Sequence, residues 1–464
     1  MIDTYAKSVK LGIAPTRRTV FSREDAVKYK NLILEKVKSM GIDFIDLEWL
    51  NEDGLLYDAT DVNKVVLKFQ NEGVDALFTP HCNFGTEDAV AKLAMELGKP
   101  LLIWGPRDEE PLDDGTRLRD SQCGLFAASK VLSRMGVSFS YIENCRINDK
   151  AFEDGLRRFI AAASIVRSFR RMRIGQIGTR PGPFWSVMCN EAELLEKFKI
   201  EVVPISLVDI AKAVNKKLSD DPATLETEVR EYSSRVKYSF DESQMYKMAA
   251  LKYVIKQWAA AEGLSAIAFQ CWDALQDALG IMPCFVNSEI TGEGLPVVCE
   301  TDVCGAISAV IAQAARLGET PVFFADITVR HPKNDNAELL WHCGPFPHKL
   351  IKEGSEGKIG EHYVLDSRCP GVAEWEIKGG DISICRFDGL KGKYSIMAAR
   401  GKGVEGPRNR GTYIWVEFKD WPELERKLIE GPYIHHVAGI HGDIVPIIQE
   451  ALHFMPEIED DTVL

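Results

Sequence analysis

Residues 295–326 read LPVVCETDVCGAISAVIAQAARLGETPVFFAD. Two apolar runs, Leu295–Val298 and Val322–Ala325, flank a helix-like segment, and an acid follows each of them: Glu300 and Asp326. Apolar runs of this length that alternate with helices are typical of buried strands in a parallel sheet. A buried carboxylate has to be paired, hydrogen-bonded or bound to metal. This stretch therefore predicts a strand–helix–strand unit with two carboxylates at the edge of the sheet where ligands bind.

The same alternation extends along the chain on both sides of this unit. Apolar strands and amphipathic helices alternate from the N-terminus, and a second series begins after the basic stretch 167–171. Past Gly344, period-two strands separated by Gly-rich turns indicate an antiparallel β domain. The further predicted strands are Ile42–Ile45, Ala76–Thr79, Leu101–Trp104, Ile174–Ile177, Glu201–Val203, Ala266–Phe269, Ile382–Phe387, Tyr394–Met397 and Thr412–Phe418, and the clearest predicted helices are Ser22–Met40 and Glu87–Leu97.

A chain of 464 residues is too long for one ordinary hydrophobic core. We expect an α/β protein with two doubly wound, Rossmann-like α/β domains followed by a C-terminal antiparallel β domain. The expected domains are residues 1–170, residues 171–345, which carry the two carboxylates, and residues 346–464.

Composition excludes some classes of partner. Apolar residues make up 45% and charged residues 27% of the chain, as is typical of soluble globular proteins. The net charge of −13 argues against nucleic acid or an anionic membrane as a partner. The sequence contains no run of about 18 apolar residues, so no membrane span is predicted. The eleven cysteines follow no disulfide or zinc spacing, and residues 1–11 hold no signal-type apolar core, so a cytoplasmic protein is expected.

Histidines gather in the same part of the chain as the two carboxylates. Eight of the nine lie after residue 330; His342 follows a strand-like run, and His435–His436 follows a Gly-Pro turn. Singly, each acid is more simply explained as a helix cap or an ion-pair partner, and a lone histidine as structural. Together, these side chains predict a divalent-metal site, and the mixture of carboxylate and imidazole suits Mn²⁺, Mg²⁺ or Co²⁺.

The residues that build this cluster resemble the L-fucose isomerase and L-arabinose isomerase superfamily over essentially the whole chain. Glu300-Thr301-Asp302 is similar to a motif of Glu-Asn-Asp type that ends one strand in that family, and Phe324-Ala325-Asp326 matches its Phe-Ala-Asp. His436 to His441-Gly442 keeps the spacing of the family's Asn-His-x-x-x-x-His-Gly. His342 resembles a fourth metal ligand of the arabinose branch.

The resemblance implies an aldose–ketose isomerase. It implies that Glu300, Asp326, His436 and His342 hold Mn²⁺, or Mg²⁺ or Co²⁺, with His342 open between a metal and a substrate role. The ion would hold O1 and O2 of a monosaccharide, and the two carboxylates would move protons through a cis-enediol as acid and base. It further implies a homo-oligomer, often a hexamer, in which the N-terminal domain of one subunit closes the site of another.

The resemblance also suggests residues that contact the sugar. Ala268-Phe269-Gln270 is similar to the family's Gly-Phe-Gln, and residues 12–18 are similar to its arginine-bearing turn. Residues 79–85 are similar to the loop that covers the sugar, although the aromatic residue of the family is missing at the matching position. The loop 178–183 lacks dinucleotide-binding Gly-x-Gly spacing and is expected to line the distal end of the sugar instead. The substrate-binding candidates are Gln270, Arg17, Arg18, Asn83, Arg180, Trp185 and His435.

Three alternatives stay open at this point. The family includes enzymes for sulfo-sugars, and Arg17, Arg18 and Arg180 could meet the sulfonate of sulfoquinovose or could simply be salt-bridged. A non-catalytic sugar-binding homologue is a second alternative, although a binder has no need for a costly pair of buried carboxylates. A metal-dependent epimerase or aldolase that uses the same enediol chemistry is the third.

Overall fold

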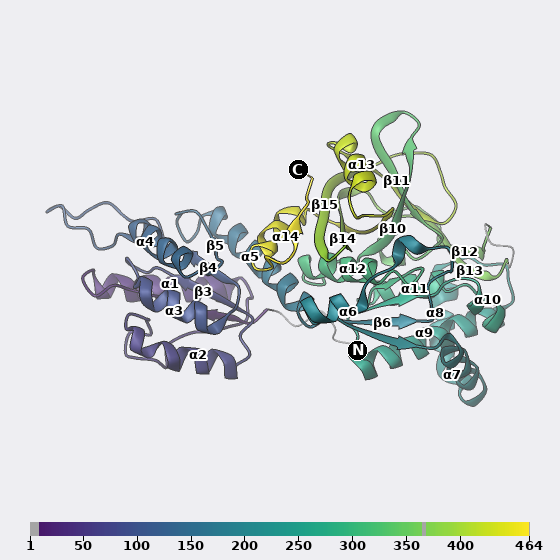
Figure 1. Ribbon diagram of the computed structural model, residues 1–464, viewed down its shortest axis with the longest axis horizontal. Helices are drawn as coiled ribbons and strands as arrows, with labels where there is room; N and C mark the ends of the chain where they lie inside the picture. Colours follow the sequence, from purple (N-terminus) through teal and green to yellow (C-terminus); the bar gives the residue numbers. More distant parts are fainter. Residues whose placement is uncertain (1–8, 364–367, 464) are drawn as a thin grey trace. The chain divides into compact units, whose positions relative to one another are not determined.

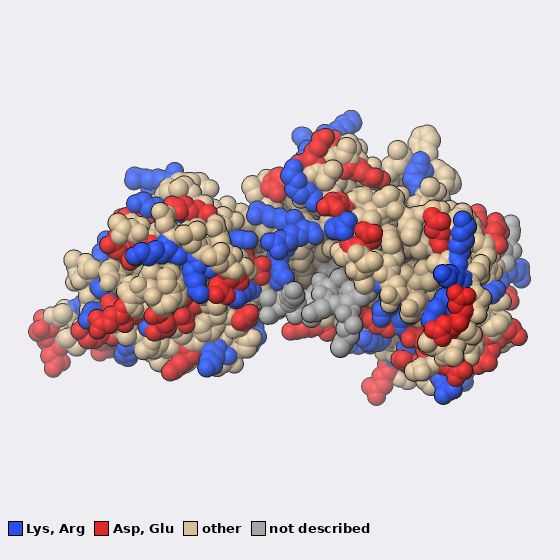
Figure 2. Space-filling model, turned by 90° about the horizontal axis from the view of Figure 1, so that it is seen from below, with Lys and Arg blue, Asp and Glu red and all other residues tan. Residues whose placement is uncertain are grey.

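The computed structural model describes residues 9–363 and 368–463, which divide into two compact units. The N-terminal unit comprises residues 9–167 and 449–456, and the main unit comprises residues 168–448 and 457–463 apart from the gap. Figure 2 shows acidic and basic side chains mixed over the visible face of each unit. Within the described ranges, no helix combines the length and the apolar character that crossing a membrane requires.

The N-terminal unit is built on a parallel five-stranded sheet with the order β2-β1-β3-β4-β5, flanked by helices (Figure 1). The central strands β3 and β4 are buried along their whole length, as expected for a parallel sheet with both faces covered. The strands are β1 (Leu11–Ile13), β2 (Phe44–Ile45), β3 (Ala76–Pro80), β4 (Leu101–Trp104) and β5 (Ser140–Tyr141), and the helices are α1 (Arg23–Ser39), α2 (Val62–Asn71), α3 (Glu87–Leu97), α4 (Ser121–Arg134) and α5 (Lys150–Phe169). The strand–helix alternation predicted for this region is confirmed.

The main unit begins with a second parallel sheet, of order β7-β6-β8-β9. Its strands are β6 (Arg173–Ile177), β7 (Glu201–Ile205), β8 (Ala266–Phe269) and β9 (Val297–Val298). Its helices are α6 (Glu191–Glu193), α7 (Leu207–Asp220), α8 (Glu226–Arg235), α9 (Glu242–Glu262), α10 (Ala274–Leu279), α11 (Cys284–Gly292) and α12 (Val303–Ala315). The strands predicted in this region, from β6 to β9, are therefore confirmed as parallel neighbours.

The rest of the main unit is a nine-stranded sheet of order β12-β13-β16-β11-β10-β17-β14-β15-β18. A further pairing between β15 and β16 joins six antiparallel strands, β16-β11-β10-β17-β14-β15, into a closed barrel. The strands are β10 (Phe323–His331), β11 (Asn334–His342), β12 (Lys358–Glu361), β13 (Pro370–Glu376), β14 (Gly380–Leu390), β15 (Lys393–Val404), β16 (Thr412–Phe418), β17 (His436–His441) and β18 (Glu459–Asp460). The helices are α13 (Trp421–Glu430) and α14 (Val445–Leu452), of which residues 449–452 belong to the N-terminal unit.

The structure corrects one strand assignment that concerns the site. The run Val322–Ala325 was expected to continue the parallel sheet and to end at Asp326, but it lies in β10, which is antiparallel to β11 and β17. The strand runs on to His331, so Asp326 lies inside it. A short apolar run has the same pattern in a buried parallel strand and in a barrel strand, because both bury it. The two carboxylates therefore come from two different sheets.

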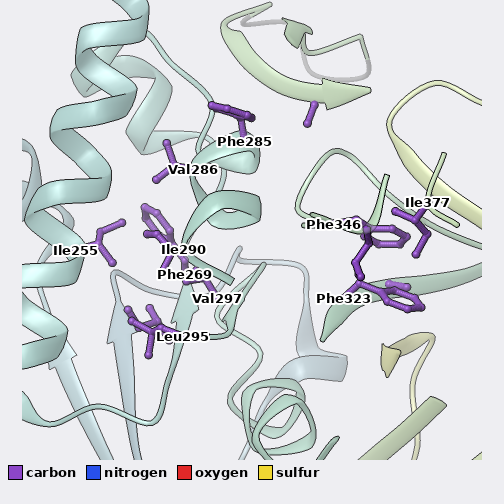
Figure 3. Packing of buried hydrophobic residues seen from close by; sticks show 14 of the residues in the cluster. Ile255, Phe269, Phe285, Val286, Ile290, Leu295, Val297, Phe323, Phe346 and Ile377 are labelled. Carbon is purple, nitrogen blue, oxygen red and sulfur yellow. The ribbon is translucent and has the colours of Figure 1, made fainter. Parts of the chain in front are cut away.

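Helix α12 connects these two sheets and is buried along its whole length. It contacts β8 of the parallel sheet on one side and β14 and β17 of the barrel on the other (Figure 1). A helix that is apolar all round is stable only when every side is covered. Figure 3 shows side chains of this core, among which Phe269, Ile290 and Val297 lie together. Phe323 and Phe346 form a second contact, with 4.8 Å between their ring centroids. Val297 of β9 and Phe323 and Ala325 of β10 thus belong to one continuous hydrophobic core.

A buried glutamate in β11 predicts how stability depends on pH. Burial raises the pKa of Glu338 to about 7, because Arg330 lies 3.4 Å away and offsets only part of the desolvation. Between pH 4.5 and 7 the unfolded chain has lost this proton while the folded chain keeps it, so the contribution of Glu338 to stability falls as pH rises. We expect Glu338→Gln to match the wild type in urea midpoint at pH 4.5 and to exceed it at pH 8. A difference between the two proteins that does not change with pH would contradict this.

Candidate active site

Four side chains from four separate segments point at one another in the main unit. The Nε2 atom of His436 lies 3.6 Å from Oε2 of Glu300 and 3.4 Å from Oδ1 of Asp326. The Nε2 atom of His342 lies 3.5 Å and 3.9 Å from the same two oxygens. The structure therefore brings together all four of the residues that the sequence suggested as metal ligands.

Strand pairing positions two of these side chains. Asp326 on β10 and His436 on β17 are directly opposite in the antiparallel register, so their side chains leave the same face as cross-strand neighbours. His342 closes β11, the other neighbour of β10, where Trp341 pairs with Asp326. The barrel thus supplies three of the four groups from adjacent strands.

Glu300 comes from a strained turn between β9 and α12. Glu300 and the next residue, Thr301, have φ angles of 55° and 53°, in the left-handed region that β-branched residues strongly avoid. Such conformations cost roughly 1–3 kcal/mol each and persist only where the surroundings impose them. The backbone of Thr301 donates to Phe269 O at 3.2 Å, and that of Asp302 to Cys299 O at 3.2 Å. The turn directs the Glu300 carboxylate toward the barrel strands.

The free atoms of this cluster fit a divalent cation. Oε2 of Glu300, Oδ1 of Asp326 and Nε2 of His342 are all buried and have no hydrogen-bond partner. Buried polar atoms without a partner are rare and call for an explanation. An ion held at about 2.0–2.2 Å from each ligand separates neighbouring ligand atoms by roughly 3–3.5 Å. The four nitrogen–oxygen separations of the cluster, 3.4–3.9 Å, are close to that range. The two-oxygen, two-nitrogen donor set suits Mn²⁺ or Co²⁺.

Other donors border the cluster without the same geometry. A nitrogen of His435 lies within 4.8 Å of the ligand atoms of Asp326 and His436, but this side chain is exposed. The Cys271 thiol and the Trp272 indole donate to Oε1 of Glu300 at 3.6 and 3.2 Å. These bonds occupy Oε1 and leave Oε2 free to face the barrel.

The charges of the four groups perturb one another strongly. Burial raises the pKa of Glu300, but the positive charges of His342 and His436 outweigh it and lower the pKa to about 2. Burial raises the pKa of Asp326, and the charge of Glu300 adds to the rise. Burial lowers the pKa of His342 and His436, yet the neighbouring carboxylates raise both above the usual value. In the ion-free protein the histidines thus act as the counter-charges of the carboxylates, a role that a bound cation would take over.

Sequence reasoning missed the residues that hold His436 in place. Its Nδ1 atom lies 2.9 Å from Oδ2 of Asp302, which Arg386 on β14 also contacts. Burial raises the pKa of Asp302, but the charge of Arg386 outweighs it and holds the pKa well below its usual range. A sequence signal did exist, because Arg386 and Asp388 stand two apart in the run 384–388, whose other residues are apolar, and so share a face of the strand.

Three of the four predicted sugar-contacting residues of the main unit lie on the loop after β6 and at the end of β8, and the fourth, His435, directly precedes β17. Gln270 Oε1 accepts from the backbone of Thr179 at 3.0 Å. Gly178 has a φ of 74°, and a Cβ there would be 2.2 Å from that oxygen, so glycine is required for this contact. Arg180 donates at 3.1 and 2.7 Å to carbonyls of its own loop and, among the described residues, pairs with no carboxylate. Trp185 is 74% exposed.

The other three candidates belong to the N-terminal unit, where each has partners. Arg17 pairs with Asp53 at 3.1 Å and Arg18 with Glu87 at 3.1 Å. The Asn83 amide nitrogen donates to two backbone carbonyls, and its oxygen accepts from three backbone N–H groups. Within this unit these side chains hold the loops after β1 and β3 in place. Both arginines are therefore in ion pairs, the simpler of the two roles expected for them.

The sequence is similar to sugar isomerases. Residues 12–170 match the family described as "Fucose/sulfoquinovose isomerase, N-terminal domain". A sulfoquinovose isomerase of Alkalicoccus urumqiensis is 25% identical over 390 residues, which cover 83% of this chain and 86% of that protein. One of Priestia aryabhattai is 25% identical over 375 residues, covering 80% and 82%. One of Clostridium sp. strain MSTE9 is 21% identical over 377 residues, covering 79% and 82%.

Proposed function

We propose, from the premise that this chain belongs to the L-fucose isomerase-like superfamily, that it is a metal-dependent aldose–ketose isomerase whose substrate is a sulfo-sugar of the sulfoquinovose type. The relatives that match most of the chain are sulfoquinovose isomerases, which supports both the isomerisation and the substrate. The observation that carries the proposal is the convergence of Glu300, Asp326 and His436, with His342 beside them, around atoms that lack partners.

The isomerisation moves one proton between carbon atoms and one between oxygens. Glu300, Asp326 and His436 would hold a divalent ion, whose Lewis acidity would polarise the sugar carbonyl and acidify the neighbouring hydroxyl. One carboxylate removes the proton from C2 while O1 gains a proton, which gives the cis-enediol. Loss of the O2 proton and return of a proton to C1 then give the ketose. Glu300 and Asp326 come from two different sheets, so one can transfer protons at the carbon atoms and the other at the oxygens.

Solvent exchange tests this reaction. Protein stripped with EDTA and reloaded with Mn²⁺, Mg²⁺ or Co²⁺ is incubated in D₂O with sulfoquinovose, and with glucose, which carries a hydroxyl where sulfoquinovose has its sulfonate. We expect a ketose from sulfoquinovose only after reloading, with solvent deuterium at C1, as followed by NMR. A ketose without deuterium would mean that the hydrogen reaches C1 without exchange with solvent, as a hydride shift requires, and saturable binding without conversion would support the non-catalytic homologue instead.

Arg180 is the residue that we propose for the sulfonate. Unlike Arg17 and Arg18, it has no carboxylate partner among the described residues, and it lies on a loop whose Phe184 packs edge-on against Trp272, at 5.3 Å between ring centroids. Trp272 in turn donates to Glu300, so the loop contacts the site through one side chain. Arginine offers a planar fork of donors that suits multi-oxygen anions.

Arg180→Met should therefore lower kcat/KM for sulfoquinovose by about 10- to 150-fold, as expected for the loss of one charge-assisted contact of 1.5–3 kcal/mol. The low activity on glucose should stay within about twofold, because glucose has no anionic group. Arg230→Met is the matched control, since Arg230 pairs with Glu226 on the exposed face of α8. Equal losses on both sugars would mean that Arg180 supports the fold of the loop rather than the sulfonate.

We also propose that the protein is a homo-oligomer, as the family resemblance implies. Light scattering after size exclusion measures the mass in solution directly. A mass of about 52 kDa, that of one chain, would contradict the proposal.

A further inference from the structure

The two histidines of the site differ in what their second ring nitrogen contacts. Nδ1 of His436 faces the carboxylate of Asp302 at 2.9 Å. Nδ1 of His342 instead accepts the backbone N–H of Cys343 at 2.9 Å, and it lies 3.3 Å from the Sγ atom of the same residue, whose thiol can donate to the same lone pair. A neutral imidazole has one N–H and one lone pair, so the contact at Nδ1 determines which of the two Nε2 presents to the site.

Asp302 is fixed on all sides as an acceptor. It is fully buried at the start of α12, where its Oδ1 accepts the backbone N–H of Gly305 at 2.9 Å. The buried Arg386 contacts both of its oxygens, with Nη2 to Oδ1 at 3.1 Å. Arg386 in turn donates to Oδ2 of Asp388 at 2.9 and 2.7 Å. A carboxylate paired with arginine has no proton to give, so the proton between Asp302 and His436 lies on Nδ1 of the histidine.

We infer that Asp302, held by Arg386, is a positioning residue that makes His436 the imidazole ligand of the metal, whereas His342 is held as a hydrogen-bond donor to the carboxylates and the sugar. With its proton on Nδ1, His436 presents the lone pair of Nε2 to Glu300 and Asp326. With a backbone N–H on Nδ1, His342 presents a proton from Nε2 to the same oxygens. This inference rests on the proposed function for the presence of the ion, which would replace the histidines as counter-charge of the carboxylates and leave both imidazoles neutral. The contacts at Nδ1 then determine which tautomer each histidine adopts.

The division of roles has a chemical consequence. A donor at His342 lies 3.5–3.9 Å from both carboxylates that are proposed to move protons. It can hydrogen-bond a sugar oxygen that gains negative charge during enediol formation, which a metal-bound imidazole could not do through Nε2. The site then holds three protein ligands and keeps further positions of the ion open for the two oxygens of the substrate.

Mn²⁺ binding separates the two histidines. The full-length protein and its His436→Gln, His342→Gln, Asp302→Asn and Asp388→Asn variants are titrated with Mn²⁺ alone, with free Mn²⁺ followed by EPR and coordinated imidazole nitrogen counted by ENDOR. We expect one coordinated imidazole in the wild type. It should disappear in His436→Gln and remain in His342→Gln, whose Kd should stay within about threefold while kcat falls.

Asp302→Asn should raise the Kd for Mn²⁺ by about 10- to 100-fold, the usual cost of losing the partner of a ligating histidine, because asparagine can donate to Nδ1 and allow the other tautomer. Asp388→Asn does not touch His436 and controls for loss of folding, which thermal unfolding monitors in parallel. Two coordinated imidazoles, an imidazole signal that survives in His436→Gln, or no bound Mn²⁺ would each overturn the inference. Correct coordination without ketose formation would overturn the proposed function and leave this inference standing.

Discussion

Replacing Glu300 by glutamine should reduce turnover by about 10⁴-fold or more, because the change removes a ligand and a proton-transferring group at once. Proton transfer by a positioned carboxylate contributes about 10²–10⁴-fold, and loss of the ion removes the polarisation of the carbonyl as well. Glutamine keeps the shape of the side chain and can still accept from Trp272, which donates to Oε1 at 3.2 Å. We therefore expect a folded protein without activity, as measured by ketose formation in NMR.

Glu338→Gln is the matched control, since it makes the same chemical change at a buried strand glutamate outside the cluster. It should keep full activity. The Mn²⁺ affinity of Glu300→Gln separates the two roles: tight binding without turnover would assign Glu300 to proton transfer, and lost binding would assign it to the metal. Activity within tenfold of the wild type would rule out both roles.

The fold shows which sequence patterns carry information about sheets. The strands Leu101–Trp104 and Ala266–Phe269 occur where predicted, because a continuous apolar run between helices is typical of a strand covered on both faces. Val322–Ala325 has the same pattern but joins the barrel through β11 and β17. The partner of a strand depends on contacts far along the chain, so local sequence could predict this strand but not its sheet.

The candidate site divides in a similar way. Glu300, Asp326, His342 and His436 could be predicted because each is a chemically costly residue next to an apolar run, and the family resemblance joined them. Asp302 and Arg386 could not be paired from the sequence, since they are 84 positions apart and lie on a helix start and a barrel strand. Their pairing exists only because α12 packs against β14. Sequence reasoning thus predicted the four side chains that meet at the candidate site and missed those that hold His436.

Arg386→Met should destabilise the main unit by about 3–5 kcal/mol, the range for breaking a buried ion pair by removing one partner. Arg386 is 1% exposed and provides the counter-charge to Asp302 and Asp388, which are themselves buried. Methionine roughly fills the volume, but among the described residues it leaves the two carboxylates with only His436 and backbone N–H groups as partners. The measurement is the urea midpoint of the ion-free protein.

Arg400→Met on the neighbouring strand β15 is the matched control, because Arg400 is 42% exposed and its pair with Asp443 spans 3.5 Å. Exposed pairs of this kind contribute about 0–1 kcal/mol, so this variant should unfold close to the wild type. Adding Asp388→Asn to Arg386→Met removes one of the two uncompensated charges and should recover part of the loss. A loss for Arg386→Met no larger than that for Arg400→Met would mean that water or relaxation of the turn at Glu300 already compensates Asp302, and the network would then not hold His436 in place.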